Sequence, residues 1–347
     1  MSLENILDFD HKSLRELFTR AQLEPYRADQ VLEWVYKKNT FDFEKMTNLP
    51  VELRQKLKQK FVIQANQIAQ ENKSKSDGSV KLLIQMSDKE LAETVYIPHG
   101  QRRTVCVSSQ VGCKFGCVFC ASGQAGFMRN LTATEIVSQV LRAQSISDTG
   151  KITHIVFMGM GEPLDNFENV CRAIQKLNDP RLFNIGVRRI TISTSGVIPK
   201  MQDFAKKGMQ VELSVSLHAA NNVMRTKLMP INKKWPVELL IQSCREYTKA
   251  TGRIVTFEYL LAEGFNASRI DAQELSKLLK NLKCKVNLIP LNPIKEFPYK
   301  RPTQQVIQQF QNVLQMARVH STVRYSKGGD IDAACGQLRR IMVAKTS

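Results

Sequence analysis

The pattern of apolar and polar positions divides the chain into two unequal parts. From about residue 104 onward, short apolar runs alternate with longer segments in which apolar residues recur every three to four positions. The short runs predict buried strands, and the longer segments predict helices packed on them. The predicted strands are Val105–Ser109, Ile152–Gly159, Arg188–Thr194, Val211–His218, Arg253–Leu261 and Lys285–Asn292. The predicted helices are Thr132–Ser145, Asn166–Leu177, Pro199–Lys207, Pro236–Ala250, Ala267–Leu282 and Thr303–Arg318.

This alternation predicts an α/β fold, a partial (β/α)6 barrel built on parallel strands. Before the barrel, Tyr26–Lys38 carries apolar residues at helical spacing, whereas Val80–Met86 and Leu91–Ile97 resemble two strands of a hairpin. We therefore expect a small helical N-terminal accessory domain, a β-hairpin extension, the barrel, and a C-terminal loop and tail, over residues 1–75, 76–103, 104–320 and 321–347.

Charge points to a polyanionic partner. The chain has 50 Lys and Arg against 32 Asp and Glu, a formal net charge of +18. Such an excess favours nucleic acid, because basic residues that neutralise phosphates release counterions. The chain has neither an apolar run long enough to span a bilayer nor a signal peptide at its N-terminus, so we expect a cytoplasmic monomer.

Three cysteines stand within eight residues, at Cys113, Cys117 and Cys120. Gly112 and Gly116 allow the tight backbone turns that three thiolates around one centre require. Structural zinc normally takes four protein ligands, and no matching pair of cysteines follows downstream. Three thiolates suit a [4Fe-4S] cluster that keeps one iron open to a further ligand. A zinc knuckle and a redox dithiol remain as alternatives.

Polar residues recur where successive predicted strands end. Ligands in parallel α/β folds collect at these carboxyl ends. Each residue alone is more often a turn or strand cap, but together they suggest a binding site. The candidate cofactor-binding residues are Gly161, Glu162, Ser193, Ser216, Leu217, His218 and Asn292.

Two further cysteines stand out from their surroundings. Cys106 lies on the first predicted barrel strand, seven residues before the cluster motif. Cys335 lies in the glycine-rich, acidic segment Gly329–Leu338, which argues for a loop able to carry a reactive thiol.

Together these motifs resemble the RlmN/Cfr family of RNA adenosine methyltransferases, within the radical S-adenosylmethionine (SAM) superfamily. The similarity extends from about residue 20 to residue 340. It rests on the cluster loop and on Ala92–Pro98, Cys106–Gln110, Arg129–Thr132, Gly159–Pro163, Ser193–Gly196, Ser216–Ala219, Leu228–Asn232 and Asp330–Leu338.

The resemblance implies a two-stage reaction at C2 of adenine, a carbon that is not nucleophilic. One SAM would methylate Cys335, and a second SAM would give a 5′-deoxyadenosyl radical that takes hydrogen from this methyl group. The resulting carbon radical would add to adenine, and Cys106 would release the product through a transient disulfide with Cys335. Glu93 matches the family's proton acceptor.

The resemblance also implies partners. The expected substrates are an adenosine in the peptidyl-transferase centre of 23S rRNA and the adenosine 3′ of the anticodon in some tRNAs, with a low-potential electron donor such as flavodoxin or ferredoxin. The Glu93–Pro98 segment and Pro163 favour C2 over the C8 methylation of Cfr-like resistance enzymes. A zinc-stabilised, non-catalytic RNA-binding protein stays open as an alternative from another class.

Overall fold

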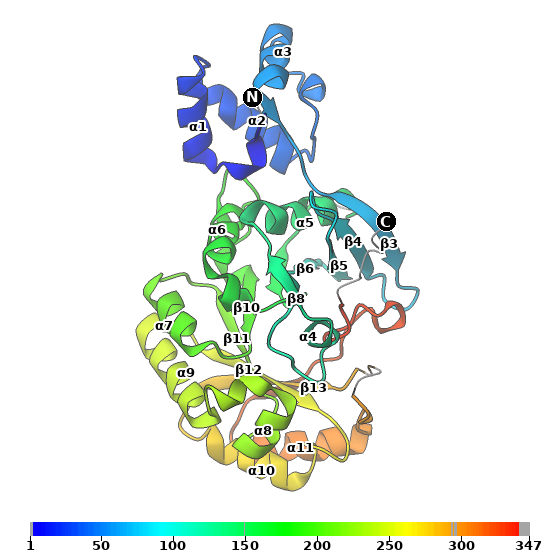
Figure 1. Ribbon diagram of the computed structural model, residues 1–347. Helices are drawn as coiled ribbons and strands as arrows, with labels where there is room; N and C mark the ends of the chain where they lie inside the picture. Colours follow the sequence, from blue (N-terminus) through cyan, green and yellow to red (C-terminus); the bar gives the residue numbers. More distant parts are fainter. Residues whose placement is uncertain (1–2, 149, 293, 295–296, 340–347) are drawn as a thin grey trace.

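The strands of the alternating region lie side by side in one sheet (Figure 1). The computed structural model describes residues 3–148, 150–292, 294 and 297–339, and within these the sheet has ten strands. Its parallel strands, in spatial order, are β6 (Arg102–Cys106), β9 (His154–Phe157), β10 (Ile190–Thr194), β11 (Glu212–Ser216), β12 (Val255–Leu261), β13 (Cys284–Pro290) and β14 (Ser321–Val323). The first six of them confirm the predicted partial barrel. The short, half-exposed β14 lies in the predicted tail, where no apolar run marks it.

Helices connect the parallel strands and cover the outer face of the sheet (Figure 1). They are α5 (Ala133–Ser145), α6 (Phe167–Asn178), α7 (Ile198–Lys206), α8 (Asn222–Leu228), α9 (Val237–Thr251), α10 (Arg269–Leu278) and α11 (Gln304–Met316). Capping boxes at Thr132 and Ser268 begin α5 and α10, and Gly252, with φ of 69°, ends α9. Among the described residues, no helix is long and apolar enough to cross a membrane.

The predicted hairpin is one part of a longer antiparallel extension of the same sheet. β5 (Leu91–His99) pairs with β6, β4 (Val80–Gln85) pairs with β5, and β3 (Gln67–Lys73) forms the edge. The sequence pattern missed β3 because most of its side chains are exposed, so its apolar positions do not alternate clearly.

The N-terminal helices form a separate lobe on the barrel (Figure 1). This lobe contains α1 (His11–Arg20), α2 (Pro25–Tyr36) and α3 (Val51–Lys60), and the short strands β1 (Glu4–Asn5) and β2 (Phe61–Val62) close it. The Leu7 carbonyl accepts hydrogen bonds from Lys176 Nζ and, at 3.1 Å, from Thr134 Oγ1. Because Lys176 is buried, its pKa falls to about 8. These contacts join the lobe to α5 and α6.

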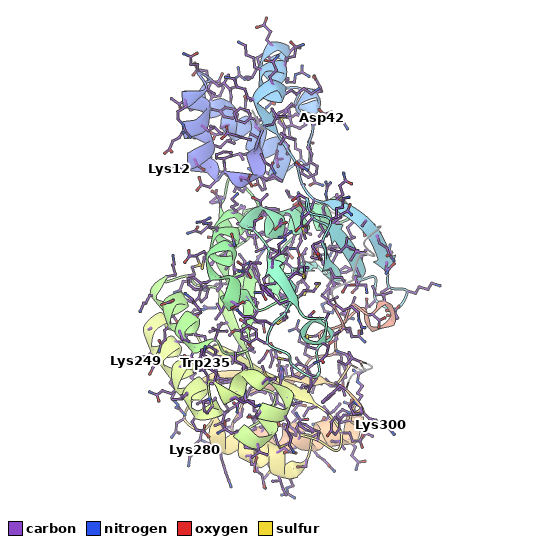
Figure 2. The ribbon with its side chains drawn as sticks, viewed as in Figure 1. Lys12, Asp42, Trp235, Lys249, Lys280 and Lys300 are labelled. Carbon is purple, nitrogen blue, oxygen red and sulfur yellow. The ribbon has the colours of Figure 1, made fainter. Side chains whose placement is uncertain are left out.

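Positive charge is spread over both parts of the molecule. Figure 2 shows exposed lysines pointing outward from the lobe and from the barrel, among them Lys12, Lys249, Lys280 and Lys300. The basic face of α3 is partly neutralised, since Lys58 pairs with Glu44 at 2.9 Å. Exposed basic residues are therefore not confined to the lobe.

Candidate active site

A short hairpin carries the three clustered cysteines. The first barrel strand ends at Cys106, earlier than predicted, and a separate strand, β7 (Gln110–Gly112), then pairs with β8 (Phe127–Asn130). Between them the Cys113 N–H donates to the Gly126 carbonyl at 2.9 Å, and α4 (Ala121–Gln124) follows Cys120. Gly112 has φ of 77°, and a Cβ there would overlap the Gly126 carbonyl. Only glycine fits this reversal of the chain.

The three thiols line one cavity at the carboxyl ends of the parallel strands. Burial raises the pKa of Cys113 to about 12 and also raises the pKa values of Cys117 and Cys120. Thiolates at this position therefore need nearby positive charge, which iron ions would supply. Three thiols and no fourth from the same loop fit a [4Fe-4S] cluster with an open iron.

Most of the predicted strand-end residues meet in this same cavity. It is lined by Gly161, Glu162, Ser193, Ser216, His218 and Asn292. Leu217 is the exception: its side chain is fully buried in the core, and its N–H donates to the Glu258 carbonyl at 3.0 Å. The reason is the alternation of side chains along β11, which ends at Ser216, so the next residue, Leu217, turns away from the cavity into the core.

Glu162 brings negative charge to the cavity wall. Its Oε2 accepts the Ser195 N–H at 2.7 Å, and its Oε1 accepts the Leu164 N–H at 3.1 Å. Burial raises the pKa of Glu162, and the bond from the Ser195 N–H opposes that rise. A Cβ at Gly161, whose φ is 98°, would overlap Gln110. Each carboxylate oxygen keeps a further lone pair for a cationic amine.

His218 is held in one tautomer. Its Nδ1 accepts the Leu260 N–H at 3.0 Å, so the ring proton lies on Nε2. Burial lowers the pKa of His218 to about 3, which keeps the ring neutral. Phe119, in the cluster loop, packs edge-on against the ring with centroids 4.6 Å apart. The backbone at His218 has φ of 58°, a strained conformation that recurs at functional sites. His218 can thus donate one hydrogen bond to a ligand.

Arg225 supports the strand ends from behind and was missed by sequence reasoning. Its Nη2 donates to the carbonyls of Ser195 and Ser216 at 2.8 and 3.1 Å, and its Nη1 donates to Asn232 Oδ1 at 2.9 Å. The arginine is almost completely buried. These bonds tie the end of β10 to the end of β11, which explains why the motif Leu228–Asn232 belongs to the site.

Two other lining residues were also missed. Ser195 Oγ and Glu258 Oε2 are buried, and neither has a hydrogen-bond partner within the described part of the chain. Buried polar atoms normally have partners, so both atoms fit contacts to bound molecules. The sequence did carry a signal for Glu258, which is the single acidic residue in the otherwise apolar β12.

Cys335 lies in the segment that follows β14, and the extension holds one end of this segment. Asp330 accepts hydrogen bonds from Ser74 Oγ at 2.7 Å and from the Lys75 N–H at 3.1 Å. The Gly328 N–H donates to Asp77 at 2.8 Å. The loop between β3 and β4 therefore serves as an anchor for the cysteine segment.

The cluster loop and β13 hold the other end. The Ala121 N–H donates to the Gly336 carbonyl at 2.7 Å, and Ser122 Oγ donates to the Leu338 carbonyl. Asn292 Nδ2 donates to the Cys335 carbonyl at 3.2 Å. Figure 1 shows this red segment beside α4. Asn292, predicted to contact the cofactor, thus also positions the cysteine.

Cys335 borders a second cavity as well, and this cavity contains Cys106. Cys106 packs in a small apolar cluster with Ala333 and Leu338, which stand on either side of Cys335 in the chain. Burial raises the pKa of Cys106 to about 12, and the neighbouring Cys335 contributes to that rise. The fold therefore brings the two predicted reactive cysteines together from distant parts of the sequence.

Glu93 lies close to this region but lines neither cavity. Its Oε1 is 3.1 Å from Lys81 Nζ, and its Oε2 accepts the Arg339 N–H at 2.8 Å. Burial raises the pKa of Glu93, and Lys81 opposes that rise. In the structure, Glu93 thus pairs with Lys81 and with the backbone of Arg339, which follows Cys335 in the chain.

Comparison with known proteins agrees with this architecture. Residues 4–63 match the ribosomal RNA large subunit methyltransferase N-terminal domain, and residues 107–275 match the radical SAM superfamily. The chain is 47% identical to a probable dual-specificity RNA methyltransferase RlmN of Thermosipho melanesiensis, covering 97% of this chain and 99% of that protein. Its identity to the protein of the same name in Fervidobacterium nodosum is 45%, covering 97% of each chain.

A solved structure shares nearly the whole fold. It is a radical SAM methyltransferase from Sphaerobacter thermophilus, 43% identical, with a TM-score of 0.93 over 97% of this chain and 99% of that chain. Identity at this level over nearly the full length establishes the family. The chain belongs to the RlmN family of SAM-dependent RNA methyltransferases of the radical SAM class.

Proposed function

We propose that this enzyme methylates C2 of an adenosine in the peptidyl-transferase centre of 23S rRNA and the adenosine 3′ of the anticodon in some tRNAs. One observation carries the proposal: Cys335 borders both the cavity of the three cluster cysteines and the cavity of Cys106. A carbon unit on its sulfur would have the methyl source on one side and Cys106 on the other. Relatives named dual-specificity RNA methyltransferases support two classes of RNA substrate.

The first cavity holds the cofactors in this proposal. Cys113, Cys117 and Cys120 ligate one [4Fe-4S] cluster, and Glu162 accepts hydrogen bonds from the amino group of SAM. Ser193, Ser216 and His218 bind its ribose and carboxylate, and the unpaired hydroxyl of Ser195 adds a further contact. When bound, one SAM would supply a methyl group. A second SAM, with one electron from a donor such as flavodoxin or ferredoxin, would supply a radical that abstracts hydrogen.

The protein's own thiols carry out the transfer. The Cys335 sulfur takes a methyl group by displacement and, after losing one hydrogen atom from that methyl, adds through carbon to adenine. The adduct must then lose its C2 ring proton to a base and one electron, which the oxidised cluster would accept. The Cys106 thiolate attacks the Cys335 sulfur and breaks the bond from that sulfur to carbon, and the departing carbon takes up a proton to complete the methyl group. The resulting Cys106–Cys335 disulfide is reduced by an external thiol before the next turnover. Glu93 is our candidate for the acceptor of the ring proton. Because the Arg339 N–H and Lys81 engage its carboxylate, this role requires the C-terminal segment to shift.

The decisive test is the modified nucleoside. Anaerobically purified enzyme, given reductant, SAM and a 23S rRNA fragment, should produce 2-methyladenosine detectable by mass spectrometry. The product 8-methyladenosine would favour the C8 alternative, and unmodified RNA with a fully loaded enzyme would refute the proposal.

The assigned thiol roles have their own test. Cys106→Ala should accumulate a covalent protein–RNA adduct, because nothing releases the base, whereas Cys335→Ala should form none. Denaturing gel electrophoresis separates the adduct from free protein. Equal adduct levels in the two variants would contradict the assignment.

A further inference from the structure

The second cavity extends into the barrel beyond Cys335. Inward-facing residues of β6, β9, β10, β11, β12 and β13 line it, and the C-terminal segment covers one side. Met158, Glu258 and Ile289 line both cavities together with Cys335. The two cavities therefore meet at Cys335, and the proposed cofactor contacts occupy only the first of them.

The rim of the second cavity carries positive charge and one exposed aromatic ring. Arg102, Arg324 and Lys327 line it, and all three side chains are exposed. Tyr325 is about half exposed, and its hydroxyl donates to Gln304 Oε1 at 2.7 Å, which fixes the ring. Cationic side chains bind phosphates, and an exposed fixed aromatic ring offers a stacking surface for a base. Such a rim suits a nucleotide.

Deeper inside stands a carboxylate with one unsatisfied oxygen. Glu258 is 3% exposed, and its Oε1 accepts a hydrogen bond from Asn287 Nδ2 at 3.0 Å. Its Oε2 has no partner at hydrogen-bond geometry among the described residues, although the Ser214 hydroxyl lies near the carboxylate and lowers its pKa. Burial raises the pKa of Glu258, and the Arg324 guanidinium, 3.8 Å from Oε1, opposes that rise. A buried acceptor of this kind is matched by a ligand that brings an N–H donor.

We propose that the second cavity binds the target nucleotide and that Glu258 accepts a hydrogen bond from the exocyclic amino group of its adenine. This inference rests on the proposed function, because it places the substrate base of that reaction. The nucleotide would leave its stack, with its phosphates at the cationic rim and its base beside Cys335. Guanine and uracil would present a carbonyl oxygen to the carboxylate and would be repelled.

The test compares two RNA substrates, one with adenosine and one with purine riboside, which lacks the 6-amino group, at the target position. Wild-type enzyme should prefer adenosine by about 10- to 100-fold in kcat/KM, the effect of losing a hydrogen bond to a charged group. Glu258→Ala should reduce this preference to within about twofold. Differences in intrinsic reactivity between the two bases cancel when the two preferences are compared.

A second variant covers the case in which Glu258→Ala does not fold. Glu258→Gln retains a neutral acceptor oxygen, so its preference for adenosine should fall to a value between those of the wild type and Glu258→Ala. Unchanged preference in either folded variant would overturn the inference. Methyl transfer to Cys335, measured as added protein mass, identifies the folded variants because that step requires no RNA.

Glu212 provides the matched control. It lines the same cavity from the neighbouring strand β11, but Arg253 already pairs with it. Glu212→Gln should keep the full preference for adenosine. If the Glu212→Gln variant loses this preference, the overall negative charge of the cavity, and not Glu258, selects the base. If wild-type enzyme methylates no adenosine, the proposed function fails. If it does, and Glu258→Ala still prefers adenosine, only this inference fails.

Discussion

In the reaction that we propose, two sets of cysteines carry the chemistry, and the fold positions them by different means. Cys113, Cys117 and Cys120 share one hairpin whose turns are set by its own backbone hydrogen bonds. Cys106 and Cys335 meet only because the barrel closes around them, since one ends β6 and the other follows β14. Residues close in sequence supply the first arrangement, with one distant bond from the Val118 N–H to the Leu228 carbonyl, whereas the second brings together residues from opposite ends of the barrel.

The supports of the two sets differ in kind. Main-chain bonds and a glycine with positive φ define the cluster loop. The Cys335 segment is held mainly by side chains from separate elements, including Ser74, Ser122 and Asn292, together with one main-chain bond from the Ala121 N–H to the Gly336 carbonyl. Residues that ligate a cofactor must keep a fixed geometry, and the main-chain hydrogen bonds of the cluster loop provide it. The Cys335 sulfur would have to move between the two cavities during the proposed reaction. Side-chain hydrogen bonds can break and re-form to allow this movement.

The largest expected effect is a difference in iron content between a variant of the cluster cysteines and a variant of Cys335. Cys120→Ala should remove the brown colour, the iron and all RNA methylation, because the cluster loses one of three ligands. Cys335→Ala should abolish methylation to the same extent and yet keep the colour and iron, because its thiol holds no metal. Visible absorption and iron analysis of anaerobically purified protein measure both. A colourless wild-type protein containing zinc would support the non-catalytic alternative instead.

Much of this arrangement could be predicted from the sequence. The six parallel strands follow from their apolar runs, and the cysteine spacing points to one metal centre without knowledge of the fold. Strand ends gather polar groups wherever strands are parallel, so six of the seven predicted strand-end residues line one cavity. The seventh, Leu217, turns away because strand alternation sets its direction.

Residues whose roles depend on distant partners could not be predicted. Arg225 lies in the short helix α8, and only the fold shows that it joins two strand ends. The loop that binds Asp330 looked like a simple connection, since its partner lies far along the chain. Strands β3 and β14 were not predicted, because exposed edge strands lack a regular alternation of apolar residues.

Alanine substitutions at one glycine of the cluster loop and one glycine of the Cys335 segment test how strongly each segment is held. Gly112→Ala combines positive φ with overlap at the Gly126 carbonyl, so the cluster loop should fail to close and most of the iron should be lost. Gly336→Ala has positive φ as well, but its Cβ would lie 3.0 Å from the Phe119 carbonyl oxygen. It should retain the cluster and reduce methylation by about tenfold, as expected for backbone strain of roughly 1–2 kcal/mol.

Gly100→Ala is the control for strain alone. Its φ is 54°, and a Cβ there would have no atom within 4 Å. Iron content, thermal unfolding and methylation rate should therefore rank the variants in the order Gly112, Gly336 and Gly100. Equal iron loss in the Gly112 and Gly336 variants would mean that both loops are equally rigid, which contradicts the comparison.

A graded effect, present in the unmodified enzyme, is expected in the pH dependence of adduct release. Burial raises the pKa of Cys106 to about 12, so near neutral pH only a small fraction is the thiolate that attacks Cys335. That fraction grows about tenfold per pH unit below the pKa, so adduct release by wild-type enzyme should accelerate by about 100-fold between roughly pH 7 and 9. Quenched single-turnover reactions on denaturing gels measure this rate. The Cys106→Ala adduct should persist at every pH, and a pH-independent wild-type rate would mean that the attacking thiol loses its proton by another route. The cluster cysteines should show no such dependence, because bound iron would hold them as thiolates, whereas for Cys106 burial outweighs the opposing charge of Arg324.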